Sequence, residues 1–246
     1  MSRRARLVVF AIGGVALAIV FGFAFARMPH FGATHHPYRD LSVAFAVLRQ
    51  SANAVSAVNF DQRGFDTLGE ETILLASVLG AVILLRPSDS ERARTPKDTG
   101  PVLSLTRLVG YVLLPVTLII GADVVAHGQL TPGGGFQGGV VLATGLHLLY
   151  ITGSYQALRR LRPLAWYEYG EAIGMGAVVV LGVSGLIAGA GFLANVLPLG
   201  TMGQLYSSGT VGVFSVAVGA EVASGVVVLL AQFLEQDIAI TQGKNE

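Results

Sequence analysis

The sequence contains no cysteine and few charged residues, and each shortage excludes a class of function. Without cysteine the chain forms no disulfide of its own and offers no thiolate for a metal site, an iron–sulfur cluster or nucleophilic catalysis. Charged residues make up only 13% of the 246 residues, while 52% are hydrophobic. So little polar surface cannot cover a soluble globule of this size, and no nucleic-acid-binding signature is present. The composition therefore predicts a protein of the lipid bilayer, with no nucleic acid as a partner.

Long apolar runs recur along the chain, and each is long enough to cross about 30 Å of hydrocarbon as a helix. We expect an all-α integral membrane protein with about six transmembrane helices, at residues 7–26, 65–85, 105–125, 134–153, 172–193 and 211–230. The first run follows three arginines and ends in Arg27, which favours a retained signal-anchor helix. Cleavage of a signal peptide after Ala26 is the alternative.

The positions of the basic residues predict the orientation, because Lys and Arg concentrate on the cytoplasmic side of a membrane. If the N-terminus is inside, only four arginines fall on the outer side: Arg27, Arg39, Arg49 and Arg63. Both termini are therefore expected in the cytoplasm.

A charged, proline-bounded stretch separates the first two apolar runs from the last four, and it suggests a joint between two modules. Between the first two runs, Leu41, Phe45 and Leu48 recur at helical spacing, which predicts a short amphipathic surface helix. The predicted organisation has four parts: a two-helix N-terminal module with this outer amphipathic segment (1–86), a cytoplasmic linker (87–104), a four-helix domain (105–236) and a cytoplasmic tail (237–246).

The second apolar run begins next to acidic residues. Its uncharged part is too short to span, so the helix must draw Asp66, Glu70 and Glu71 toward or below the membrane interface. Asp66 and Glu70 share one face at i, i+4 spacing, which suits cation coordination or a proton relay. The alternative is that these acids stay solvated and pair with Arg63.

Glu221 lies in the middle of the last apolar run, too far from either end for its side chain to reach the surface. A carboxyl group at that depth must be neutral, hydrated or partnered, so it is a candidate for ion or proton exchange. A protonated Glu221 that only hydrogen-bonds a neighbouring helix is the alternative.

Three further polar side chains are candidates for the ion path. His147 lies inside the fourth run, where it either relays protons or packs with a backbone acceptor. Asp123 and His127 lie four residues apart at the outer end of the third run and either belong to the path or cap the helix. Glu168 and Glu171 stand beside Trp166 and two tyrosines, a cluster typical of headgroup anchors.

The most distinctive segment runs from His127 to Gly139, between the third and fourth apolar runs, and is rich in glycine. Glycine allows positive φ and close approach, and proline suits the first turn of a helix, so the chain is expected to turn here and re-enter the membrane. The structural motif comprises His127, Pro132, Gly133, Gly134, Gly135, Phe136, Gly138 and Gly139.

This His-Gly-x-x-x-Pro-Gly-Gly-Gly-Phe-x-Gly-Gly pattern, followed by further membrane helices, resembles the B subunit of multisubunit Mrp-type Na⁺/H⁺ antiporters, the MnhB or MrpB family. The resemblance covers roughly residues 105–236. The earlier stretch 60–85 is similar to the C-terminal end of the large A-type subunit, which also occurs as a small separate subunit of membrane-bound hydrogenases.

The resemblance implies an accessory subunit, without cofactor, metal or catalytic site of its own, in a multi-pass arrangement in the plasma membrane. Its partners would be A, C, D, E, F and G type subunits, and Na⁺ and H⁺ would be the transported ions. The family places acids of the first module near a cation path, which carries over to Asp66 and Glu70, and it makes Pro132 and Phe136 positions that affect function. Glu221 matches no family motif. The alternatives are a membrane-arm subunit of a hydrogenase or related respiratory complex, and a purely structural subunit.

Overall fold

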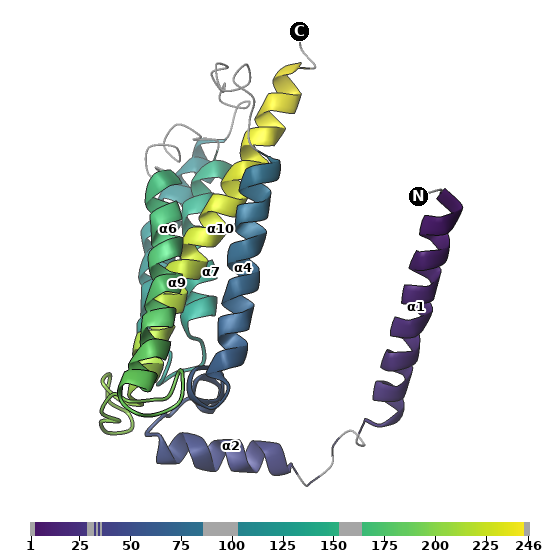
Figure 1. Cartoon of the computed structure of the whole chain (residues 1–246). Coiled ribbons are helices and arrows are strands. Elements are labelled where there is room, and N and C mark those ends of the chain that lie inside the picture. Colours follow the sequence, from purple (N-terminus) through teal and green to yellow (C-terminus); the bar gives the residue numbers. More distant parts are fainter. Residues whose placement is uncertain are drawn as a thin grey trace. The chain divides into compact units, whose positions relative to one another are not determined.

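The structure, a computed structural model, describes residues 3–28, 32, 34, 36–85, 103–152 and 164–243, and within these ranges it contains helices and no strand. The helices are α1 (Arg3–Ala26), α2 (Pro37–Leu48), α3 (Ala54–Ala57), the π-helical turn η1 (Val58–Gln62), α4 (Gly64–Leu84), α6 (Ser104–Ala126), α7 (Gly135–Ile151), α9 (Leu164–Ile187) and α10 (Thr210–Gly243). This architecture (Figure 1) confirms the predicted all-α membrane fold. Almost all of the predicted linker 87–104 lies outside the described residues.

The chain divides into two compact units, residues 1–41 and 42–246. The first unit holds α1, a helix of 24 residues whose side chains are exposed and mostly apolar. The second unit holds α4 to α10 and every residue of the candidate site.

Five of the described helices are long and apolar enough to cross a membrane: α1, α4, α6, α9 and α10. The sixth expected span, α7, has 17 residues and is therefore only about 26 Å long. It starts late because Gly133 and Gly134 have φ values of 134° and 141°, which a right-handed helix does not accommodate. At the other extreme, α10 continues beyond its expected span to Gly243.

α10 is the central helix of the second unit, and 61% of its apolar segment is buried, against 17% to 28% in α4, α6 and α9. It packs against α9, α7, α4, α6 and η1. The side chain of Phe214 stacks on Phe60 of η1, with ring centroids 5.0 Å apart, and both belong to the hydrophobic core. This contact fixes the start of α4 against the first turns of α10.

The directions of the helices follow from glycine contacts. On α7, Gly135 abuts Ser215 and Gly139 abuts Val222, so α7 and α10 are parallel. On α9, Gly174 abuts Ala217 whereas the earlier residue Gly170 abuts Ser224, so α9 is antiparallel to α10. α6 runs antiparallel to α7 in the same way, since Gly121 lies against Leu142 and Gly110 against Thr152.

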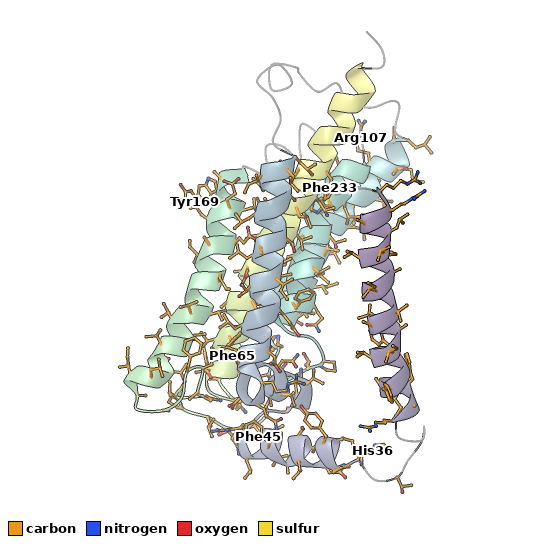
Figure 2. The ribbon with its side chains drawn as sticks, turned by 45° about the vertical axis from the view of Figure 1, so that its right-hand side comes forward. His36, Phe45, Phe65, Arg107, Tyr169 and Phe233 are labelled. Atoms are coloured by element: carbon orange, nitrogen blue, oxygen red, sulfur yellow. The ribbon has the colours of Figure 1, made fainter. Side chains whose placement is uncertain are left out.

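Figure 2 shows the consequence: Arg107 of α6, Tyr169 of α9 and Phe233 of α10 lie toward one end of the bundle, and Phe65 of α4 lies toward the other. Successive helices of the bundle therefore cross it in alternating directions, as a multi-pass chain requires.

The predicted amphipathic helix is present as α2, although its buried face differs from the expected one. Ser42 and Ala46 are buried, while Leu48 is 74% exposed. The small residues face inward because α2 packs closely on η1, where the Ser42 hydroxyl meets Gln62 at 3.4 Å.

Candidate functional site

Asn53 holds the glycine-rich loop in place. Its side-chain Nδ2 donates to the backbone oxygens of Gly128 and Thr131, both at 2.8 Å. Its Oδ1 accepts from the backbone nitrogens of Val55 and Ser56 and so caps α3. The Ser56 hydroxyl donates to the same Gly128 oxygen at 2.6 Å. A single buried amide thus joins the segment before α4 to the loop before α7.

Replacement of Asn53 by Ala is expected to loosen this loop, because two backbone oxygens lose their donor. The cost should be about 2 kcal/mol, or roughly 30-fold faster amide exchange. Hydrogen exchange of the Leu130 and Thr131 amides, which donate to the His127 oxygen, measures it. Ser56→Ala removes one bond to the same loop and should have a smaller effect. Unchanged protection in Asn53→Ala would show that the loop holds itself.

Three buried glutamates from three helices form the chemical centre of the bundle. Glu221 of α10 is fully buried, Glu71 of α4 is 1% exposed and Glu171 of α9 is 3% exposed. Among the described residues, neither oxygen of Glu221 has a hydrogen-bond partner, and the same holds for Oε2 of Glu71 and Oε1 of Glu171. Buried carboxyl groups without partners are rare, so this arrangement calls for a functional explanation.

The three acids are ordered along α10. Glu71 lines a cavity together with Val218. Glu221 follows one turn later, where the backbone of Gly174 on α9 approaches so closely that a Cβ there would lie 2.7 Å from the Glu221 nitrogen. One turn further, Gly225 lies beside Oε1 of Glu171. From Val218 to Gly225 the helix rises about 10 Å, so the acids form a short column.

Electrostatics couples these groups, since Glu71 and Glu171 both lie within Coulombic range of Glu221. Three like charges in a medium of low dielectric constant repel one another strongly, so they cannot all be ionised without a cation to balance them. The described residues contain no cluster of His, Asp or Glu arranged to hold a metal ion. The column is thus spaced for passing a proton or a monovalent cation between single carboxylates.

Two predicted site residues lie at the surface with charged partners. Asp66 is 53% exposed at its side chain and forms an ion pair of 2.5 Å with Arg63. Asp123 is 64% exposed at its side chain and its Oδ1 lies 2.8 Å from Nδ1 of His127. These are the surface alternatives considered for both acids.

His147 and Glu70 also lie apart from Glu221. His147 places Nδ1 2.6 Å from the backbone oxygen of Ala143, the packed arrangement considered from the sequence. It lies eight residues beyond Gly139, hence about 12 Å along α7 from the level of Glu221. Glu70 is exposed and lines the cavity.

Sequence reasoning missed two of the three buried acids. Glu171 was expected to be a headgroup anchor, and its burial shows that expectation to be wrong. The signal was its position three residues before Gly174, on the small-residue face that packs against α10. Glu71 follows Glu70 directly, so the two carboxylates point away from each other on the helix, and only Glu71 turns toward α10.

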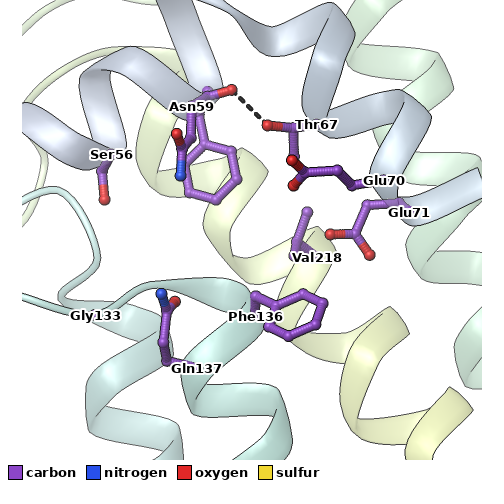
Figure 3. A pocket seen from close by; sticks show the side chains of 10 residues that line it. Ser56, Asn59, Thr67, Glu70, Glu71, Gly133, Phe136, Gln137 and Val218 are labelled. Atoms are coloured by element: carbon purple, nitrogen blue, oxygen red, sulfur yellow. Dashed lines mark hydrogen bonds between the residues drawn. The ribbon is translucent and has the colours of Figure 1, made fainter. Parts of the chain in front are cut away.

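A cavity of about 200 Å³ lies where η1, α4, the start of α7 and α10 meet (Figure 3). It connects the predicted motif with the buried acids, since Gly133 and Phe136 lie across it from Glu70 and Glu71. Most of its lining side chains are polar: Ser56, Asn59, Thr67, Glu70, Glu71 and Gln137.

Comparison with known proteins relates this arrangement to membrane complexes. An uncharacterized protein of Methanocaldococcus jannaschii is 27% identical over 199 residues, which cover 70% of this chain and 73% of that protein. A probable K⁺/H⁺ antiporter protein of Rhizobium meliloti, described as a combined A/B subunit, is 30% identical over 201 residues, which cover 69% of this chain but only 20% of that larger protein.

Two solved structures share the fold. A chain of the membrane-bound sulfane sulfur reductase, an archaeal respiratory membrane complex, matches with a TM-score of 0.73 and 25% identity over 94% of this chain and 98% of that one. A chain of the Mrp complex from Dietzia sp. matches with a TM-score of 0.68 and 23% identity over 94% of this chain and 26% of that one.

The family assignment rests on residues 105–228, which contain α6 to α10 apart from its end, the glycine-rich loop, Glu171 and Glu221. They match the family model described as a domain related to the MnhB subunit of Na⁺/H⁺ antiporters. This stretch makes up just over half of the 246 residues. The chain therefore belongs to the MnhB-related family, as its glycine-rich motif predicted.

Proposed function

We propose that the chain is an accessory membrane subunit of a multisubunit cation/proton antiporter and that Glu71, Glu221 and Glu171 form part of its ion path. The observation that carries this proposal is Glu221, which is fully buried with two unpartnered oxygens between two other buried acids. A packing framework alone has no use for three uncompensated carboxyl groups, because each is costly to bury.

The same geometry suits exchange of two ions. A proton or a monovalent cation balances one carboxylate at a time, and mutual repulsion among the three sites helps each bound ion to leave. Family membership favours Na⁺ as the exchanged cation, and the name of the Rhizobium relative makes K⁺ the first alternative.

The assembly follows from the modules. The Rhizobium relative joins the A and B types in its name and aligns over 201 residues, which supports an A-type N-terminal module joined to a B-type domain. Partners of the A, C, D, E, F and G types would complete the complex in the plasma membrane. The end of the bundle that carries Arg107 would face the cytoplasm, together with both termini, and the glycine-rich loop would face outward.

The test compares everted membrane vesicles from cells that lack other antiporters and express the complete complex with or without this chain. Addition of Na⁺ or K⁺ should collapse a preformed pH gradient only when the chain is present. A complex that exchanges cations equally well in its absence would contradict the proposal.

A respiratory complex is the second candidate, because the reductase chain matches almost end to end. Purification of the native complex separates the two. Subunits with nickel–iron or iron–sulfur centres would favour the respiratory machine, whereas the presence of only antiporter-type subunits would exclude it.

A further inference from the structure

The cavity beside Glu71 has an exposed rim and a buried floor. Asn59, Glu70 and Gln137 at its rim are exposed or half-buried, whereas Thr67 and Glu71 at its floor are buried. Figure 3 shows the Glu71 carboxyl group directed into the space between Val218 and Phe136. The cavity thus leads from the level of the glycine-rich loop to the first acid of the column.

Protein groups leave the floor of this cavity unsatisfied. The Thr67 hydroxyl donates to the backbone oxygen of Asn59 at 2.7 Å, and the Ser56 hydroxyl donates to Gly128, so neither serves Glu71. Oε2 of Glu71 has no partner among the described residues. A volume of about 200 Å³ accommodates about six waters, and a polar cavity of this kind holds them.

The charge of the cavity has one sign. Glu70 at the rim and Glu71 at the floor are its ionisable groups. The nearest arginine along the chain, Arg63, pairs with Asp66 instead. A cleft lined by one sign of charge raises the local concentration of counter-ions.

We propose that this cavity is a hydrated, cation-selecting vestibule through which water and small cations reach Glu71 from the side of the membrane that carries the glycine-rich loop. Glu71 then lies one helical turn of α10 from Glu221, so an arriving ion meets the column at its first member. What the ion does next rests on the proposed function, whereas entry of water and cations does not.

The absence of cysteine makes the vestibule directly testable. Gln137→Cys places a thiol at the rim and Thr67→Cys places one at the floor. Ile73→Cys is the matched control, because Ile73 lies on α4 near the same level, is 69% exposed and is not part of the cavity lining. Each variant is expressed in the intact complex, in right-side-out and in everted vesicles, and treated with membrane-impermeant cationic or anionic thiosulfonate reagents. The unmodified complex reports labelling of the partner chains.

Both cavity thiols should react from one side only, the outer side in the orientation proposed above, and Ile73→Cys should not react. The cationic reagent should react at least about 10-fold faster than the anionic one, and Glu70→Gln should reduce this preference several-fold. Absence of reaction at both cavity thiols would overturn the vestibule, and equal rates for the two reagents would overturn its selectivity.

Labelling needs no exchange activity, so this test is separate from that of the ion path. Normal labelling in a complex whose Glu221→Gln variant exchanges ions normally would keep the vestibule and remove the path. A lost vestibule with an inactive Glu221→Gln complex would do the reverse.

Discussion

Replacement of Glu221 by Gln should lower cation/proton exchange by roughly 100-fold or more, the loss typical of removing a side chain that transfers protons. Gln has nearly the same size and shape, so the close packing of Gly174 against this turn of α10 is retained. It carries neither a dissociable proton nor a charge to attract a cation. The initial rate of Na⁺-induced collapse of the pH gradient in everted vesicles measures the effect.

Asp66→Asn is the matched control. It also converts a carboxylate to an amide, but at an exposed side chain that pairs with Arg63, where an ion pair contributes at most about 1 kcal/mol. Its exchange rate should stay within a few-fold of normal. Copurification of the partner subunits shows that both variants assemble. If Glu221→Gln and Asp66→Asn were equally active, the acids would be structural, and the chain would serve the complex only by packing.

The sequence was most informative where a residue type conflicted with its surroundings. Glu221 stood out because a carboxylate at mid-span has no route to water, and the structure places it fully buried. The motif from His127 to Gly139 revealed the family through the same kind of conflict, glycines that weaken two helices. Both signals are local, so a single sequence contains them.

The missing part of the site depends on how helices face one another. Glu71 and Glu171 lie close to solvated ends in the sequence, and only the tight contact of α9 and α4 with α10 buries them. That contact depends on rotation of each helix about its own axis, which hydrophobic periodicity defines poorly in a chain that is apolar all round. For the same reason Asp66 and Glu70 were expected to act together, although only Glu70 lines the cavity.

Closely packed glycines determine where the column can form. α7 and α9 reach the backbone of α10 at Gly135, Gly139 and Gly174, and these contacts place Phe136 and Gln137 at the vestibule and Glu171 next to Glu221. The glycine-rich motif therefore acts at a distance from the ions. Its function is to bring polar side chains of separate helices within one turn of each other.

Substitution of Gly135 by Ala should consequently disrupt the helix bundle. A Cβ there would collide with the backbone oxygen of Ser215 and would lie 2.8 Å from the nitrogen of Gly219. Backbone atoms of a helix cannot move aside as a flexible side chain does, so α7 must shift away from α10, at a cost of about 3 kcal/mol or more.

Gly176→Ala is the control, because a Cβ at this position of α9 meets nothing within 4 Å and Ala favours a helix by up to about 1 kcal/mol. The amount of each variant in the purified complex, and its melting temperature there, should fall sharply for Gly135→Ala and stay level or rise for Gly176→Ala. Any Gly135→Ala complex that does assemble should also lose reactivity at a cysteine introduced for Gln137, since displacement of α7 alters the rim. Normal assembly together with normal reactivity would mean that α7 does not rest on α10 as closely as these contacts require.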